Sequence, residues 1–440
     1  MRPTQSIRLV TMNGVFVYVL VVLFGTGSWV TLNGLWVELP LLVPHLPEGW
    51  TLPSYLNVII QVANIGPIGI ALLFHFAKEK VNDKCVIYLL LSFGCVAALF
   101  LMFFWKTTSL IAGDFHSSGL FILVFVLAIV CCSASVVFLP FMALFKKHYI
   151  TAFFIGQGMS GLLPSVVALA QGVGSMTCEN VTSSDENQNV TDYVLIPVYH
   201  TPFFSVEQFI FFLFSTTLVC LISFTLLNTL SCCKREYTST CRDKGITEDD
   251  VYIETEDNQL SQRKPEDDLR AMTPISLAGF LILNLLINVI ANGCLPPVQT
   301  YSCLPYGTDI YHWSVTLSNI ANPMACFVAF VFPVVSQRII YGVTTAGFAT
   351  ASYILYTASS SPTPAFPDIG PTLVVLTWVF TTTLLTFAKV SIATLFLNEG
   401  KDALRMYGIG SQSGSTLGAI IMYILINVIG KFENAEPCPS

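Results

Sequence analysis

The chain has 440 residues, of which 54% are hydrophobic and only 11% are charged. Soluble domains carry about 25% charged residues, so this composition excludes an ordinary soluble protein. Its apolar runs are continuous and about twenty residues long, whereas the strands of a membrane β-barrel alternate over about ten. The formal net charge is −7 and the sequence holds no basic cluster of the kind that binds nucleic acid. The composition therefore predicts an all-α polytopic membrane protein.

About eleven apolar windows along the chain are long enough to span a bilayer. The first window exceeds the usual core of a signal peptide, so we expect it to be a retained helix. The weakest division separates the eighth window from the ninth, where only Gln337 and Arg338 interrupt the apolar run. The windows begin near Asn13, Ser54, Cys85, Gly119, Tyr149, Phe203, Thr273, Ile310, Gln337, Pro371 and Leu404.

Lys and Arg fall very unevenly on the loops between these windows. With a cytoplasmic N-terminus, most of the 20 Lys and Arg residues lie on the cytoplasmic side, as the positive-inside rule requires. Eleven crossings then place the C-terminus outside. The loop between the fifth and sixth windows agrees, because it has no Lys or Arg and carries glycosylation sequons at Asn180 and Asn189.

The windows divide into two groups separated by a polar stretch. We expect an N-terminal half of six helices over 1–231 and a C-terminal half of five over 271–440. The acidic stretch 232–270 has few apolar residues and predicts a disordered cytoplasmic linker. A solvated tether is the simpler interpretation of this linker, with a regulatory segment as the alternative. The 13 Cys show no disulfide pattern, and the connectivity of those outside stays open.

An internal repeat relates the two halves. Asn33 is followed by Asn64 at almost the same separation at which Asn292 is followed by Asn322, and a proline follows each Ala-Asn pair. Glycine-rich runs in the fifth and eleventh windows match in the same order. An even number of spans precedes the second copy, so the sequence predicts parallel repeats, as in major-facilitator transporters. The alternative is coincidence among residues that are common in membrane helices.

Lys389 is the only charged residue deep inside an apolar window. A cation at membrane depth costs about 2.5–3.5 kcal/mol on insertion scales, so such a residue indicates a polar pathway or a substrate cavity. The alternative is that Lys389 extends its stem to the inner headgroups.

Amides and hydroxyls accompany Lys389 at membrane depth, and aromatic residues lie near them. Amides donate and accept hydrogen bonds to a neutral heterocycle or polyol, whereas phosphates and carboxylates favour Arg. Aromatic rings stack on flat ligands. For each amide the alternative is a structural hydrogen bond between helices. We predict a substrate site from Trp29, Asn33, Trp36, Glu38, Gln61, Asn64, Gln157, Asn292, Gln299, Tyr301, Asn319, Asn322 and Lys389, with Asn288, Ser411 and Gln412 as further polar candidates.

Glu38 lies near the outer end of the first window. It is either an ordinary interfacial carboxylate or a gating and proton-sensing group. No chain of carboxylates or histidines crosses the membrane windows, so we expect weak rather than strict coupling to protons.

Several long strings resemble solute carrier family 52, the riboflavin transporters. They are GSWVTLNGLWVELPLLVPHLPEGWTLPSYLNVIIQVANIGP from Gly27, FLPF from Phe138, FFIGQGMSGLLPSVVALAQG from Phe153, NGCLPPVQTYSCLPYG from Asn292, ANPMACF from Ala321 and FAKV from Phe387. The resemblance runs from the first window to the last. The first of these strings are most similar in appearance to member 3 of the family. It implies sodium-independent uptake of riboflavin at the plasma membrane by alternating access, with a fold similar to equilibrative nucleoside transporters.

Two other functions remain alternatives. One is a nucleoside or purine carrier on the same architecture, and the other is a cell-surface receptor, for example for a virus. No metalloprotease, serine-hydrolase or nucleotide-binding motif is present, so we expect neither an enzyme nor a bound cofactor. We expect a monomer in the lipid bilayer.

Overall fold

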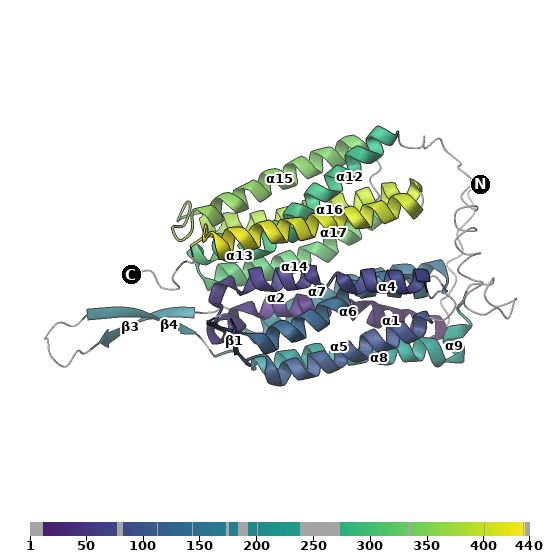
Figure 1. Cartoon of the computed structure of the whole chain (residues 1–440), viewed down its shortest axis with the longest axis horizontal. Coiled ribbons are helices and arrows are strands. Elements are labelled where there is room, and N and C mark those ends of the chain that lie inside the picture. The colour runs from purple at the N-terminus through teal and green to yellow at the C-terminus, as the bar shows by residue number, and fades with distance from the viewer. Residues whose placement is uncertain are drawn as a thin grey trace.

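The helices form a bundle whose axes run roughly parallel, with two short β-hairpins at one end (Figure 1). We call this end the hairpin end. The computed structural model describes residues 12–76, 82–111, 113–142, 144–172, 176–183, 192–199, 201–237, 273–332, 336–399, 401–433 and 435. The predicted linker therefore lies outside the described residues, except for its start, and the predicted domain boundaries stay predictions.

The first half of the bundle contains the helices up to α9. Two of its crossings are broken, between α1 and α2 and between α3 and α4, while the others are continuous. The elements are α1 (Met12–Thr26), α2 (Val30–Leu42), η1 (Val43–His45), η2 (Gly49–Thr51), α3 (Leu52–Val62), α4 (Ile65–Phe76), α5 (Asp83–Phe104), α6 (Ser118–Met142), α7 (Lys147–Gln171), α8 (Val206–Thr229) and α9 (Ser231–Lys234), with hairpins β1 (Ser109–Ile111) with β2 (Asp114–His116) and β3 (Met176–Ser183) with β4 (Asp192–Tyr199).

The second half lies beside the first and contains the helices from α12 onward (Figure 1). Its first crossing is also interrupted, here by a π-helical segment, η3. The elements are α12 (Pro274–Asn288), η3 (Val289–Cys294), α13 (Leu295–Cys303), η4 (Leu304–Tyr306), α14 (Thr308–Val331), α15 (Gln337–Ser359), α16 (Gly370–Glu399), α17 (Lys401–Tyr423) and the π-helical η5 (Ile424–Val428).

Among the described residues, eight helices are long and apolar enough to cross a membrane. A ninth crossing results if α1 and α2, which are bent by 53°, count as one. Helices α6 and α14 have 25 and 24 residues and pack alongside these crossings. The polytopic helical class is confirmed, whereas the number of eleven spans stays a prediction. The division predicted at Gln337 is where α15 begins.

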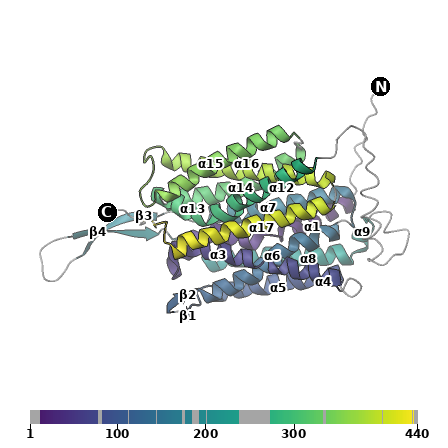
Figure 2. The same ribbon diagram turned by 45° about the horizontal axis from the view of Figure 1, so that its top comes forward.

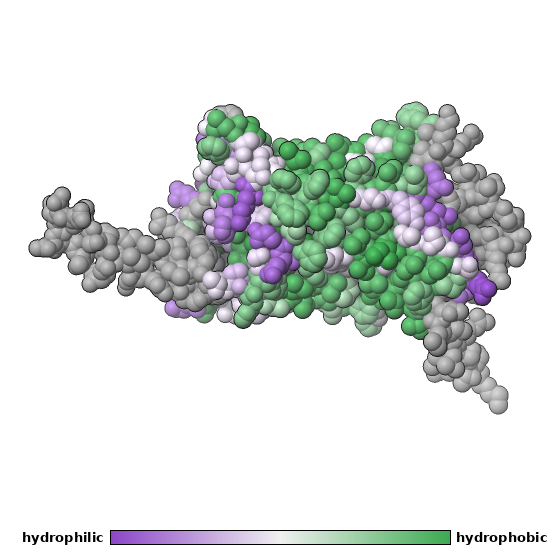
Figure 3. Space-filling view, turned by 90° about the horizontal axis from the view of Figure 1, so that it is seen from below, coloured by the Kyte–Doolittle hydropathy of each residue, from purple (hydrophilic) through white to green (hydrophobic). Residues whose placement is uncertain are grey.

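On the face that Figure 3 shows, an apolar belt crosses the middle of the molecule and polar residues gather towards both ends. Large apolar side chains of the bundle, such as Phe93, Phe103 and Phe211, are more than half exposed. Exposed apolar surface of this extent would be unfavourable in water, and it matches the hydrocarbon core of a bilayer.

The two halves repeat the same helix packing. In the first half α1 packs on α7 and α5 on α6, and in the second half α12 packs on α17 and α15 on α16. The contacts between the halves are also paired, since α7 packs on α14 and α17 lies along α3 (Figure 2). This arrangement confirms the parallel repeat that the sequence predicts.

Glycines allow close contact between α1 and α7 in the first half and, at the corresponding place, around η3 and α17 in the second half. A Cβ on Gly156 would lie 2.2 Å from the carbonyl oxygen of Val22 and 2.9 Å from the Cα of Gly25. A Cβ on Gly418 would lie 2.3 Å from the carbonyl oxygen of Val289 and 2.9 Å from the Cα of Gly293. Both values are far below van der Waals contact, so these glycines serve close helix packing.

We predict that Gly156→Ala destabilises the protein, because the added methyl group must push α1 away from α7. Overpacking of this kind costs about 1–3 kcal/mol. The check is the thermal unfolding of the purified full-length protein in detergent. The matched control is Gly69→Ala, where nothing lies within 4 Å of the new Cβ. Equal unfolding temperatures for the two variants would contradict this interpretation of the glycine contact.

Candidate substrate-binding cavity

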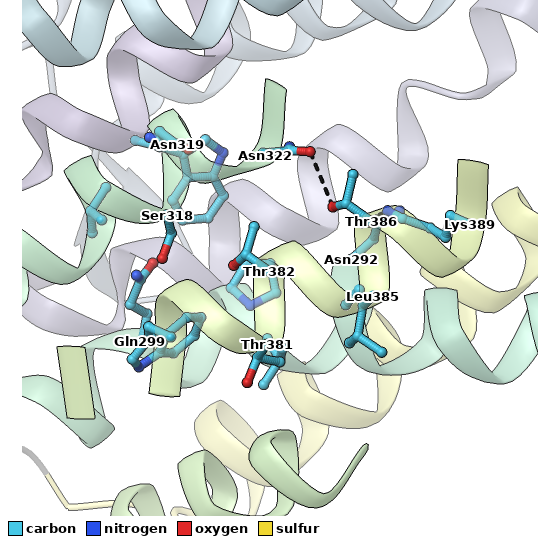
Figure 4. Close-up of a pocket in the computed structure, with 16 residues that line it drawn as sticks. Asn292, Gln299, Ser318, Asn319, Asn322, Thr381, Thr382, Leu385, Thr386 and Lys389 are labelled. Atoms are coloured by element: carbon cyan, nitrogen blue, oxygen red, sulfur yellow. Dashed lines mark hydrogen bonds between the residues drawn. The ribbon is translucent and has the colours of Figure 1, made fainter. Parts of the chain in front are cut away.

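A cavity of about 190 Å³ lies among α2, η3, α13, α14 and α16 (Figure 4). This volume is below the range of about 300–1,000 Å³ that is usual for ligand pockets. Nearly all of its wall comes from the second half, and Trp36 on α2 is the first-half residue among those that line it. The lining residues are Trp36, Ala291, Asn292, Leu295, Pro296, Gln299, Val315, Ser318, Asn319, Asn322, Trp378, Thr381, Thr382, Leu385, Thr386 and Lys389.

The local sequence of the first crossing in this half explains why it bends into the cavity. The run NGCLPP places Pro296 and Pro297 just after the π segment η3. Proline lacks an N–H and cannot close the preceding helical turn, and π segments often occur at functional sites. The interruption turns Asn292 and Gln299 towards the same cavity.

Lys389 ends a ladder of asparagine side chains that runs along α12. Its Nζ donates to Asn292 Oδ1 at 3.3 Å, and Asn292 Nδ2 donates to Asn288 Oδ1 at 2.9 Å. Asn288 Nδ2 donates to Asn284 Oδ1 at 3.0 Å, and Ser411 Oγ of α17 donates to the same oxygen at 3.2 Å. The ladder fixes the orientation of each amide, so an acceptor faces the lysine.

The ladder decides which group remains available for a ligand. Asn292 Nδ2 also donates to Ser415 Oγ at 3.2 Å, so both of its protons are engaged. An ammonium group has three donors, and Lys389 uses one of them on Asn292. None of the lining residues is Asp or Glu. The cavity thus presents a cationic donor whose charge no lining carboxylate balances, and Lys389 is placed in the cavity wall as the sequence predicts.

Other polar atoms of the wall differ in whether they already have a partner. Thr386 Oγ1 donates to Asn322 Oδ1 at 3.1 Å, as Figure 4 shows. Ser318 Oγ and Asn319 Nδ2 are buried and have no partner among the described residues. Buried polar atoms are normally hydrogen-bonded, so an unpaired donor in a cavity wall indicates a place for a ligand or water.

Six of the predicted residues line this cavity, and the others lie elsewhere. That these residues contact the substrate stays a prediction. Those that line the cavity are Trp36, Asn292, Gln299, Asn319, Asn322 and Lys389. Those outside the lining are Trp29, Asn33, Glu38, Gln61, Asn64, Gln157 and Tyr301.

Several residues outside the lining have structural partners instead. Asn33 Nδ2 donates to Ser160 Oγ at 3.4 Å, and Asn64 Nδ2 donates to Gln61 Oε1 at 3.2 Å. The Tyr301 ring is 2% exposed and packs 5.4 Å from the ring of Phe432. The further candidates Asn288 and Ser411 belong to the asparagine ladder behind the wall.

Glu38 is fully buried on α2, outside the cavity wall. Gln171 Nε2 of α7 donates to Glu38 Oε1 at 3.0 Å. Glu38 Oε2 and Gln171 Oε1 have no partner among the described residues. Glu38 is therefore part of the α2–α7 contact and not an exposed interfacial carboxylate.

Helix α16 contributes further lining residues that were not predicted from the sequence. Trp378, Thr381, Thr382 and Thr386 line the cavity with Lys389. Thr382, Thr386 and Lys389 are spaced by four and three residues, which places them on one face of a helix. This spacing was the available signal, since it groups hydroxyls with the one intramembrane lysine.

A scan against family models matches residues 13–434 to the solute carrier family 52 riboflavin transporters. The chain is 40% identical to "Solute carrier family 52, riboflavin transporter, member 3-B" of Danio rerio over 96% of this chain and 98% of the relative. It is 37% identical to member 3 of Homo sapiens with the same coverage of both chains.

A solved structure shares the fold at low sequence identity. A point mutant of the nucleoside transporter NupG superposes with a TM-score of 0.55 over 94% of this chain and 92% of that chain, at 12% identity. At this identity the likeness concerns the fold alone. The family match covers nearly the whole sequence and therefore identifies the family as well as the fold. It agrees with the expectation that the chain is not an enzyme. The chain belongs to solute carrier family 52, the riboflavin transporters.

Proposed function

We propose that this chain carries riboflavin across the membrane by alternating access and that the cavity of the second half holds the substrate. Family membership supports the substrate. The observation that carries the site is the pair of unpaired buried donors, Ser318 Oγ and Asn319 Nδ2, in a wall that also holds Trp36 and Trp378. Indole rings stack on a flat tricyclic ligand, and the donors match its carbonyl and ring-nitrogen acceptors.

The composition of the cavity wall also supports a neutral substrate over an anionic one. A single lysine and several amides and hydroxyls line it, with no Arg among the lining residues. Phosphates and carboxylates are commonly held by bidentate Arg groups. Lys389 suits a carbonyl oxygen, while Gln299 and the threonines suit hydroxyl groups of a polyol chain.

We predict that Lys389→Met weakens the apparent affinity for riboflavin about tenfold or more. The methionine keeps the apolar stem but removes the charged donor, and a hydrogen bond to a charged group contributes about 1.5–3 kcal/mol. The measurement is saturable uptake of labelled riboflavin per copy at the cell surface, with and without excess nucleoside. Strong competition by the nucleoside would favour the alternative carrier function.

Asn322→Ala and Asn64→Ala separate this cavity from the wider site predicted from the sequence. Asn322 lines the cavity, whereas Asn64 pairs with Gln61 outside it. We expect Asn322→Ala to weaken affinity about tenfold, as loss of a buried partner costs about 1–3 kcal/mol. Asn64→Ala is the matched control and should change affinity less. The reverse ranking would place the substrate outside this cavity.

We propose that the hairpin end faces the outside of the cell at the plasma membrane. The support is the distribution of charge. Lys84, Lys146, Lys234 and Arg338 lie where α5, α7, α9 and α15 meet the opposite end of the bundle. The positive-inside rule makes that end cytoplasmic.

This orientation predicts glycosylation of the loop that carries β3 and β4. Asn180 lies in β3, and Asn189 lies outside the described residues. Glycosidase treatment of the wild-type chain made in animal cells should increase its gel mobility, and substitution of both asparagines by Gln should remove the shift. Unchanged mobility of the wild type would argue against an external hairpin end.

We predict that Glu38→Gln flattens the dependence of riboflavin uptake on external pH without abolishing transport. The carboxylate is buried with one oxygen unpaired among the described residues, and Glu207 of α8 is near enough to repel a negative charge there. A buried unpaired charge is costly, so binding of a proton to the Glu38 carboxylate is favoured and depends on external pH. Gln is neutral at every pH and removes this dependence. An unchanged pH profile, or complete loss of transport after the proton gradient is collapsed at fixed external pH, would contradict weak coupling through Glu38.

A further inference from the structure

The proline pair of the second half leaves two backbone carbonyls without their helical donors, those of Asn292 and Gly293. In an α-helix the N–H of residue 297 would serve the carbonyl of Gly293, but residue 297 is proline. Helix α13 begins at Leu295, so the next N–H, that of Val298, serves the carbonyl of Cys294. At membrane depth an unserved carbonyl is costly, and a donor from elsewhere is needed.

The donor for Gly293 comes from the other half of the protein. Asn57 of α3 donates its Nδ2 to the carbonyl oxygen of Gly293 at 3.0 Å, and the contact is buried. The Asn57 side chain is 3% exposed. Gly293 directly follows Asn292, the residue that accepts the hydrogen bond from Lys389 in the cavity wall.

Asn57 is part of a group of contacts that close the bundle at the hairpin end. Asn427 Nδ2 of the second half donates to Ser54 Oγ at 2.7 Å. The rings of Trp50 and Tyr311 lie 5.2 Å apart, and those of Tyr55 and Tyr423 lie 5.6 Å apart. In each pair one partner lies between residues 50 and 57 and the other lies in the second half. These contacts must part if a ligand enters the cavity from the hairpin end.

We propose that Asn57 is a positioning residue that replaces the missing N–H of Pro297, so that the Gly293 carbonyl is served only when the hairpin end is closed. When that end opens, water can serve the carbonyl. When it is closed, only Asn57 does. The bond thereby ties closure of the bundle to the segment that carries Asn292. This inference rests on the proposed transport of riboflavin.

The test is a double-mutant cycle between Asn57 and Pro297 in the full-length protein. Asn57→Ala should lower the maximal rate of riboflavin uptake per surface copy about tenfold without raising the external KM, because closure and not binding is impaired. Pro297→Ala gives Gly293 its own helical donor. In that background the effect of Asn57→Ala should shrink below about twofold. An equal loss in both backgrounds would overturn the proposal.

Asn427→Ala is the matched control for this cycle. It removes another hydrogen bond between the halves, one whose acceptor is the side chain of Ser54. Its effect on uptake should therefore be the same in the wild-type background and in the Pro297→Ala background. If the effect of Asn427→Ala on uptake changed between the two backgrounds as much as that of Asn57→Ala, Pro297→Ala would weaken the contacts between the halves in general. That result would overturn the specific role of Asn57.

Asn57→Asp decides the question if Pro297→Ala itself abolishes uptake. An ionised aspartate has the shape of asparagine but cannot donate, whereas its protonated form can. The uptake of this variant, relative to the wild type at the same pH, should rise as external pH falls. A ratio that stays constant with pH would contradict a donor role.

A readout without substrate separates this proposal from the proposed function. Cys294 is a free thiol next to Gly293 and is 8% exposed. Its labelling by N-ethylmaleimide in the purified, riboflavin-free protein should be faster in Asn57→Ala than in the wild type, and not faster in Asn57→Ala/Pro297→Ala than in Pro297→Ala. If the wild type fails to transport riboflavin but this pattern holds, only the proposed function is wrong. If the labelling rates do not differ, the bond does not control closure.

Discussion

The need to satisfy every backbone polar group inside a bilayer governs this structure. Regular helices meet it on their own, but the first crossing of each half is interrupted, by a bend of 53° between α1 and α2 and by the π segment η3. Interrupted helices survive in membranes where protein covers the freed groups. Here Gly293 receives a donor from Asn57, so the irregular segment of the second half is partly satisfied by the first half.

A second cost is the charge on Lys389, and the surrounding residues show how it is offset. The asparagine ladder from α12 turns an amide oxygen towards Nζ, and Ser411 of α17 holds the far end of the ladder. Asn292 in the wall and three polar side chains behind it thus support one donor, the ammonium group of Lys389. Because amides are neutral, they offset the burial cost without cancelling the charge, which leaves Lys389 able to interact with a substrate.

The sequence was sufficient for the features that depend on periodicity and composition. The helical membrane class and the parallel repeat follow from the apolar windows, and the polar surroundings of Lys389 follow from the position of one cation. Which polar residues line one cavity could not be predicted from the sequence, because polar residues at similar depth face different neighbours. Asn64 and Asn322 are related by the repeat, yet Asn64 pairs with Gln61 while Asn322 lines the cavity. Depth can be estimated from sequence, whereas the direction of a side chain depends on packing. Asn57 has no sequence signal of its own, since its role arises from a proline 240 positions away.

The comparison of the halves indicates a division of labour that symmetry alone would not give. The second half supplies nearly all of the cavity wall, and the first half contributes Trp36. The repeat-related asparagines of the first half have other partners, since Asn33 donates to Ser160 and Asn64 donates to Gln61. With nearly all of the lining residues on one half, motion of the other half can open or close the cavity without separating them from one another. Such an arrangement lets the polar ladder behind Lys389 stay intact through a transport cycle, because all of its members lie on α12, η3, α16 and α17 of the second half.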